Sequence, residues 1–274
     1  MRIFLYISVV VGCSVLSAAH AQTFTDVTIP YVQYQNRPDL PKIKFEQGKP
    51  EEAGKVADAG SLKAQVAFQP GMRPLVMLAH GCDGLGNTPT QDWIRDWSRF
   101  FWAKGYSIMV VDSFTTRGVV SVCGGPAEHW SWRRRDDAFS ALDWLATQGK
   151  TDMSNVVLMG RSNGGNVAIR VMDRNIYSAR SHHFRQTIAM YPWCKNDVDT
   201  HFTGPVSIFI GKDDDANKAE YCEAMHQPNV TVTVYPNTYH GFDDGSKFRY
   251  DHGWRLGSNP SSTSMAREAI SVRL

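Results

Sequence analysis

One stretch of the chain decides its fold: Asn155-Val156-Val157-Leu158-Met159-Gly160-Arg161-Ser162-Asn163-Gly164-Gly165-Asn166. It opens as an apolar, β-branched strand, passes through a Gly-x-Ser-x-Gly turn and continues into a helix expected over 165–173. A serine on so sharp a turn needs glycine neighbours, because other side chains would crowd the backbone. The pattern predicts a nucleophile elbow that lifts the hydroxyl of Ser162 clear of a sheet. The same five-residue pattern also occurs by chance, so its surroundings must decide.

Strands and helices alternate on both sides of this stretch. Buried strands are expected over 74–79, 107–111, 156–159, 184–190, 206–210 and 230–235. Helices are expected over 91–104, 129–147, 165–173, 217–225 and 262–272, the first of them capped by Thr90. Strands separated by helices form βαβ units. The sequence therefore predicts an α/β fold with a mostly parallel sheet and helices on both faces.

The chain divides into three segments. Residues 1–21 form a targeting segment, and residues 22–61 form a polar, Pro-rich extension in which 27–32 can be a strand. From 62 to 274 there is no repeat, low-complexity tract or interior linker, which indicates a single domain. Its first element, Leu62–Gln69, alternates in apolarity and is expected to be an edge strand or a hairpin arm.

The N-terminus has the features of a secretory signal peptide. Arg2 supplies a positive charge, residues 3–16 are apolar, and Ala19-His20-Ala21 fits a cleavage site. The apolar run is shorter than the ~20 residues that cross a bilayer, so no stable membrane anchor is expected. Lipid attachment at Cys13 is the alternative interpretation of this segment. We expect an exported protein, periplasmic or extracellular.

The cysteines bear on this expectation, because disulfides persist in exported proteins. Four remain after the signal segment: Cys82, Cys123, Cys194 and Cys222. Four cysteines allow three connectivities, and buried free thiols are the alternative. Cys82 and Cys123 follow strands that are expected to be neighbours, and Cys222 lies on the helix expected within reach of Cys194. We therefore predict the disulfides Cys82–Cys123 and Cys194–Cys222.

Candidate functional residues follow the predicted strands, where ligands of such sheets bind. The strand over 206–210 is followed by three adjacent carboxylates, Asp213, Asp214 and Asp215. The Gly-x-x-Asp spacing selects Asp214, whereas its neighbours fit an acidic turn before the next helix. His240 follows the last strand in a Gly-flanked loop. The order Ser162…Asp214…His240 is that of a hydrolase triad of nucleophile, acid and base.

A serine nucleophile also needs hydrogen-bond donors for the oxyanion that its attack creates. The first buried strand ends in His80-Gly81-Cys82-Asp83-Gly84, and this loop can turn the amide of Cys82 toward the serine. The amide of the residue after the nucleophile, Asn163, is the second expected donor. An ordinary glycine-rich turn is the alternative interpretation of the first loop.

Four further residues follow strands and are candidates for substrate binding: Asp83, Arg117, Trp193 and Tyr239. Arg117 can bind a substrate carboxylate, but an arginine in such a place more often forms a structural ion pair, for instance with Asp112. Tyr191 and Trp193 can line a pocket, although a place in the core is the commoner role for such aromatic residues.

Composition excludes several other classes of function. The chain has 274 residues, with 29 Lys and Arg against 27 Asp and Glu, and a net charge of +2 gives no electrostatic case for nucleic acid. There is no His-Glu-x-x-His, Cys-x-x-Cys, phosphate-binding or dinucleotide motif. We expect no metal and no cofactor, and the sequence carries no signal for an oligomeric state.

Taken together, these motifs resemble the dienelactone hydrolase family of α/β-hydrolases, in particular its secreted bacterial members. The resemblance runs from about Ala64 to Leu274. It rests on the loops and turns above and on three further motifs: Asp112-Ser113-Phe114 with Arg117-Gly118, Arg135-Asp136-Asp137 with Leu142-Asp143-Trp144-Leu145, and Tyr239-His240-Gly241-Phe242. It implies an α/β-hydrolase fold with Ser162 as nucleophile, His240 as base and Asp214 as acid.

One departure from the family affects the expected substrate. The members that cleave dienelactones have a cysteine nucleophile, whereas this chain has Ser162. A serine is activated by a positioned base, so a hydrolase of small carboxylic esters is expected instead. A serine peptidase of the prolyl-oligopeptidase type and a non-catalytic exported binding protein are the alternatives.

Overall fold

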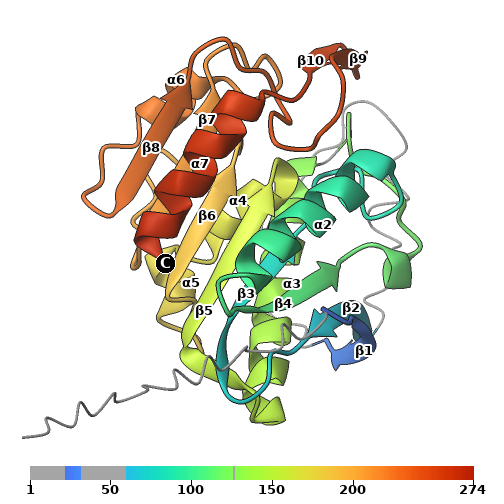
Figure 1. Ribbon diagram of the computed structural model, residues 1–274. Coiled ribbons are helices and arrows are strands. Elements are labelled where there is room, and N and C mark those ends of the chain that lie inside the picture. Colours follow the sequence, from blue (N-terminus) through green and yellow to red (C-terminus); the bar gives the residue numbers. More distant parts are fainter. Residues whose placement is uncertain (1–21, 32–59, 126) are drawn as a thin grey trace, which may run out of the picture.

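The computed structural model describes residues 22–31, 60–125 and 127–274. The predicted signal peptide and most of the predicted extension lie outside these residues. An eight-stranded sheet runs through the molecule in the order β1-β2-β4-β3-β5-β6-β7-β8 (Figure 1). Its strands are β1 (Thr25–Pro30), β2 (Ser61–Ala67), β3 (Arg73–Ala79), β4 (Ser107–Asp112), β5 (Thr151–Arg161), β6 (Gln186–Met190), β7 (Val206–Gly211) and β8 (Val230–Tyr235).

Helices cover both faces of the sheet. They are α2 (Thr88–Trp102), α3 (Ala127–Gln148), α4 (Asn163–Arg170), α5 (Arg174–Tyr177), α6 (Ala219–Glu223) and α7 (Pro260–Arg273), with a short 3-10 helix η1 (Thr115–Arg117). Figure 1 shows α2 and α7 in front of the sheet and α3 and α4 behind it. Arg267 of α7 lies over the rings of Trp97 and Phe100 of α2, and α3 packs against α4. The predicted fold class is confirmed.

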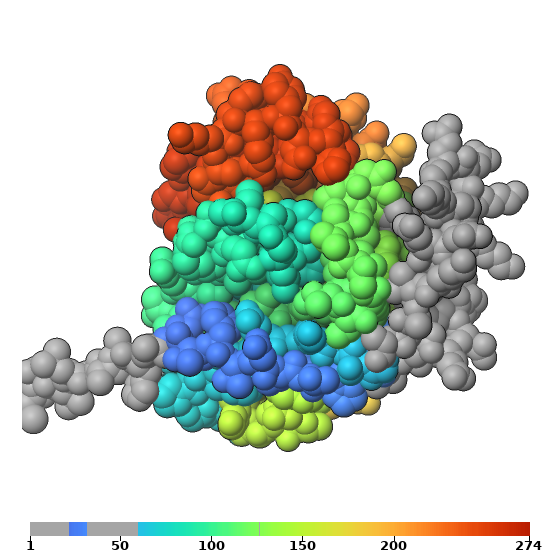
Figure 2. Space-filling model, turned by 90° about the vertical axis from the view of Figure 1, so that its right-hand side faces the viewer, coloured from blue at the N-terminus to red at the C-terminus, as the bar shows by residue number. Residues whose placement is uncertain are grey.

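The strands from β4 to β8 pair in parallel, whereas β1, β2 and β4 pair antiparallel. β2 therefore pairs on both sides and is not the edge strand that the sequence suggested. β1 forms that edge, and Figure 2 shows it on the surface. The central strands read as continuous apolar runs because both of their faces are covered: Leu75, Val76, Met77 and Leu78 of β3 are fully buried.

The start of α2 differs from its prediction. The helix begins at Thr88, and the Asn87 side chain caps it by accepting a hydrogen bond from Thr90 N at 2.9 Å. The expected cap at Thr90 was wrong because Pro89, whose fixed φ suits the first turn of a helix, allows the helix to begin three residues earlier. Asn259 caps α7 in the same way, again just before a proline.

The remaining differences concern short or polar elements. β5 is longer than its apolar run, since it already begins at Thr151. The hairpin β9 (Arg249–Asp251) and β10 (Trp254–Leu256) and the single turn of α5 were not predicted, because three- and four-residue elements carry no readable periodicity. Within the described part of the chain, no helix is both long and apolar enough to span a membrane.

Candidate active site

Ser162 occupies the sharp turn between β5 and α4. Its backbone has φ 52° and ψ −118°, a conformation that costs free energy for any residue with a side chain. The turn is so tight that a Cβ on Gly160 would lie 1.9 Å from the carbonyl oxygen of Gly164. A Cβ on Gly164 would in turn lie 2.2 Å from the carbonyl oxygen of Ala79, at the end of β3. Only glycine fits at these two positions, as the sequence pattern predicts.

The structure brings Ser162, His240 and Asp214 into one hydrogen-bonded chain. His240 Nε2 lies 3.0 Å from Ser162 Oγ, and His240 Nδ1 lies 2.8 Å from Asp214 Oδ2. The other carboxylate oxygen of Asp214 accepts the backbone N–H of Asn217 at 2.7 Å. An ionised carboxylate can only accept, so Nδ1 carries the proton and the Nε2 lone pair faces the serine hydroxyl. Asp214 and His240 are both buried.

The neighbouring aspartates have other partners. Asp215 forms an ion pair with Arg255, whose Nε lies 2.8 Å from Oδ2. The backbone N–H of Asp213 donates to Thr238 O at 3.1 Å. Among the three carboxylates that follow β7, the one that contacts His240 is therefore Asp214, which the Gly-x-x-Asp spacing selects.

An aromatic ring holds the other side of His240. The ring of Tyr191 meets it edge-on, with 4.6 Å between the ring centroids. The Tyr191 hydroxyl donates to Asp243 at 2.8 Å, and the same carboxylate accepts from the indoles of Trp93 and Trp97. Burial raises the pKa of Asp243. Tyr191 is therefore a fully buried residue that fixes the imidazole, not a wall of the pocket.

Cys82 and Asn163, the two predicted oxyanion donors, lie beside Ser162. Cys82 and Asn163 line the same cavity as Ser162 and His240. Neither the N–H of Cys82 nor that of Asn163 donates to another described residue. The loop is held by a disulfide between Cys82 and Cys123 and by a 2.8 Å hydrogen bond from Val122 N to Cys82 O.

The cavity beside Ser162 has a volume of about 370 Å³. Its wall is formed by five parts of the chain: the loop after β3, the start of α3, the turn at Ser162, Trp193 and the β9–β10 hairpin. The hairpin residues that line it are Arg249, Asp251, His252, Trp254 and Leu256. Sequence reasoning did not find this hairpin, since its residues belong to no motif.

The four candidates for substrate binding separate into two groups. Asp83 and Trp193 line the cavity, but Arg117 and Tyr239 do not. The expectation for Arg117 was wrong, because its buried guanidinium is 2.7 Å from Asp137 in a two-pronged ion pair. The structural alternative was right in kind, although Asp137 and not Asp112 is the partner.

Tyr239 also turns away from the cavity. Its ring packs against Phe248, with 5.4 Å between centroids, and against the Arg255 guanidinium at 4.9 Å. Asp83 accepts a hydrogen bond from Asn87 at 2.6 Å, and Thr90 lies within 3.3 Å of the same carboxylate. The carboxylate that faces the cavity is thus tied to the start of α2.

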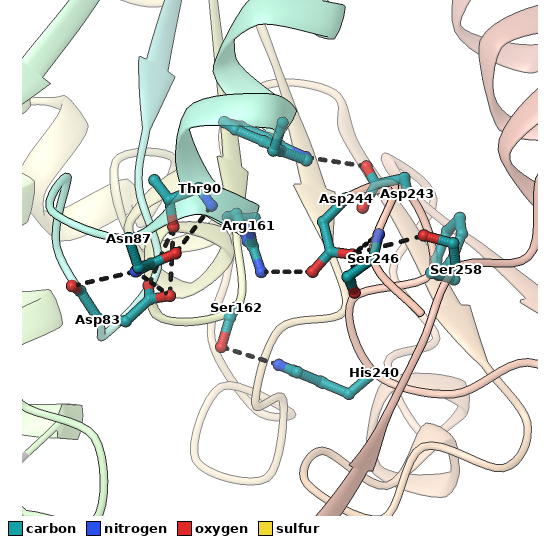
Figure 3. A network of polar contacts seen from close by, with 12 residues as sticks. Asp83, Asn87, Thr90, Arg161, Ser162, His240, Asp243, Asp244, Ser246 and Ser258 are labelled. Atoms are coloured by element: carbon teal, nitrogen blue, oxygen red, sulfur yellow. Dashed lines mark hydrogen bonds and ion pairs between the residues drawn. The ribbon is translucent and has the colours of Figure 1, made fainter. Parts of the chain in front are cut away.

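Arg161, which precedes Ser162, connects two sides of the site. Figure 3 shows it beside Ser162 and between Asp83 and Asp244. Its Nη2 lies 3.3 Å from Asp244 Oδ2, and both side chains are buried. Although burial opposes the charge, the negative groups around it, Asp83 and Asp244 among them, raise the pKa of Arg161 overall. Arg161 is therefore a buried ion-pair residue.

The second disulfide, between Cys194 and Cys222, joins the loop after β6 to α6. Both predicted pairings of the cysteines are therefore present. The described residues include no group of three His, Cys, Asp or Glu side chains arranged to hold a metal ion.

Arg134 on α3 was missed altogether. It is buried, and it donates to His80 O at 2.6 Å and to Asn163 Oδ1 at 2.5 Å. A signal was available in the sequence, since Arg134 shares the helical stripe of Ala138, Ala141, Leu142 and Leu145. A charged residue on an apolar stripe indicates a buried polar partner.

Comparisons with known proteins agree with this architecture. A family model described as an alpha/beta hydrolase fold matches residues 128–206. No curated protein matches the chain by sequence. A candidate dienelactone hydrolase from Klebsiella pneumoniae subsp. pneumoniae superposes with a TM-score of 0.62 at 16% identity, over 91% of this chain and 98% of its own.

Two further solved structures illustrate the range of similar proteins. Esterase 2 of Thermogutta terrifontis, phosphorylated by paraoxon, has a TM-score of 0.54 at 17% identity and covers 79% of this chain and 89% of its own. A candidate dipeptidyl aminopeptidase IV from Bacteroides ovatus has a TM-score of 0.57 at 13% identity, over 91% of this chain but only 35% of its own. The sheet order, the helices on both faces and these similarities show that the chain is an α/β-hydrolase-fold protein whose fold is like that of a dienelactone hydrolase.

Proposed function

We propose that the protein is a serine hydrolase that cleaves small carboxylic esters. The observation that carries this proposal is the continuous chain Ser162–His240–Asp214, with contacts of 3.0 Å and 2.8 Å, at the wall of a cavity. Such a chain activates a serine that is otherwise a weak nucleophile. The backbone amides of Cys82 and Asn163, which donate to no other residue in the described part of the chain, support the same chemistry, because they can hold an oxyanion.

The proposed reaction has two halves. In acylation, His240 Nε2 takes the proton of Ser162 Oγ while Oγ bonds to the ester carbon, and the amides of Cys82 and Asn163 hold the oxyanion. The intermediate collapses, and the alcohol leaves with the proton from His240. In deacylation, water loses a proton to His240 and its oxygen bonds to the acyl carbon. The bond from that carbon to Ser162 Oγ then breaks, Oγ takes the proton back from His240, and the carboxylic acid leaves. Asp214 stabilises the imidazolium in both halves.

The cavity supports a small substrate. A volume of about 370 Å³ is at the lower end of the range of about 300–1,000 Å³ found for ligand pockets. Trp193 and Trp254 supply apolar walls, and Asn166 and Asn217 supply polar groups near the serine. This mixture suits a short acyl chain or a compact alcohol better than a long lipid.

We further propose that the protein works outside the cytoplasm. Two disulfides in a chain of this size favour an oxidising compartment. The signal peptide predicted at the N-terminus supports the same location.

Turnover of a panel of p-nitrophenyl esters tests the proposed function. The wild type is expected to cleave short-chain esters, and Ser162→Ala to lose at least about 10³-fold in kcat/KM. Ser154→Ala, which changes an exposed serine on β5, is the control. Equal activity of the wild type and Ser162→Ala would contradict the proposal. Amide substrates in the same panel distinguish an esterase from a peptidase, and ligand binding without turnover indicates a binding protein.

A further inference from the structure

Arg134 differs from the other buried arginines around the site in what it contacts. Arg117, Arg161 and Arg170 each form an ion pair with an aspartate: Asp137, Asp244 and Asp197 respectively. No described carboxylate forms an ion pair with Arg134, which is only 2% exposed. Its partners are instead three neutral oxygens of the oxyanion region. Burying a cation without an ion-pair partner is costly. The contacts of Arg134 with these three oxygens should therefore serve a function.

The three oxygens belong to the two segments that carry the oxyanion donors. Arg134 Nη2 donates to His80 O at 2.6 Å, and Nη1 lies 3.4 Å from Gly81 O. The same Nη1 donates to the side-chain Oδ1 of Asn163 at 2.5 Å. One planar guanidinium therefore contacts both the loop after β3 and the first residue of α4.

Because a peptide unit is rigid, the contacts with Gly81 O also orient the N–H of Cys82. Gly81 C=O and Cys82 N–H belong to one trans peptide, in which the two groups point in opposite directions. With the carbonyl turned toward Arg134, the amide of Cys82 points away from the guanidinium, and Cys82 itself lines the cavity beside Ser162. A cation near the carbonyl also polarises the unit, which makes the N–H a stronger donor.

His80 acts on the same carbonyl. Its Nδ1 donates to Gly81 O at 2.7 Å, and its ring is fully buried beneath the loop. Gly81 O therefore accepts from an imidazole and lies close to a guanidinium, while the N–H at the other end of its peptide donates to none of the residues that the structure describes.

We propose that Arg134 is a positioning residue that aims and polarises both oxyanion donors, Cys82 N–H through the loop carbonyls and Asn163 N–H through the Asn163 side chain. This inference rests on the proposed serine hydrolase function. Arg134 does not touch the reacting atoms and acts through backbone groups that do. Its effect belongs to the transition state, where negative charge develops on the acyl oxygen.

The test compares an aryl ester with its thionoester, in which sulfur replaces the acyl oxygen and accepts hydrogen bonds weakly. Arg134→Met is expected to lower kcat for the ester about tenfold to 100-fold, less than the roughly 10²–10³-fold typical of a deleted donor, with little change in KM. The thionoester depends less on the donors, so the ratio of ester to thionoester kcat/KM should fall. Arg134→Lys keeps one cationic donor, so its ratio should lie between those of the wild type and Arg134→Met.

Arg170→Met is the matched control, because it removes an equally buried guanidinium that contacts neither oxyanion segment. It is expected to lose stability and to keep the wild-type ratio. An unchanged ratio in a folded Arg134→Met would overturn the inference while leaving the proposed function intact. Should Arg134→Met fail to fold, Arg134→Lys decides, and a wild-type ratio there overturns the inference. A wild type without Ser162-dependent turnover would overturn both proposals.

Discussion

The buried imidazole of His80 makes the stability of the fold depend on pH. Burial, reinforced by the nearby Arg134 cation, lowers its pKa well below the ordinary value of 6.5. The ring is therefore neutral in the folded protein, and its Nδ1–H is available to donate to Gly81 O. In the unfolded chain the same imidazole binds a proton below pH 6.5, so acid favours the unfolded state.

The free energy of unfolding should therefore depend on pH through His80. The contribution of neutral His80 is complete above pH 6.5 and is lost as the pH falls from there toward the folded pKa. Between about pH 7.5 and about pH 5.5, the wild type should lose about 1.4 kcal/mol more unfolding free energy than His80→Asn, which keeps an N–H donor. Urea unfolding of both proteins at the two pH values measures this difference in unfolding free energy. Parallel losses in the two proteins would show that His80 titrates normally in the fold.

At the scale of elements, the turn from β5 to α4 is the least tolerant part of the fold. The Cβ that Gly160→Ala adds would meet the backbone of Gly164 at 1.9 Å, and backbone cannot give way as a side chain can. We expect Gly160→Ala to lose about 3 kcal/mol or more of unfolding free energy. Gly86→Ala, on an exposed loop with no atom within 4 Å of the new Cβ, should stay within about 0.5 kcal/mol of the wild type. Similar melting temperatures for both variants would contradict this view of the elbow.

Elements and site residues could be predicted from sequence where local chemistry dictates them. The apolar run of β3 needs burial on both faces, and the two glycines around Ser162 need a turn that only they can make. The burial of Arg134 could be predicted from its place on an apolar helical stripe, but its partners could not, because two of the three are backbone oxygens that leave no trace in the sequence. The β9–β10 hairpin could not be predicted either, since its three-residue strands are held by the loop of His240 through a bridge to Leu256.

In the whole molecule, one disulfide holds a loop beside the site and the other holds a helix farther along the chain in place. Cys82–Cys123 fixes the loop after β3, whereas Cys194–Cys222 ties α6 to the loop after β6. The second closes 28 residues, and the double variant Cys194→Ala/Cys222→Ala should lose about 3–4 kcal/mol of unfolding free energy by the chain-entropy relation. Urea unfolding without reductant measures the loss. A midpoint equal to that of the wild type would show that this bond does not stabilise the fold.

Ser162, Asp214 and His240 follow three different strands of one sheet, and the fold brings them into one hydrogen-bonded chain. The reaction of the folded wild type with a fluorophosphonate, followed by intact mass and peptide mapping, tests whether this chain activates the serine. We expect a single adduct on Ser162 that is absent from Ser162→Ala. An adduct that persists in Ser162→Ala, or that maps to another residue, would contradict it.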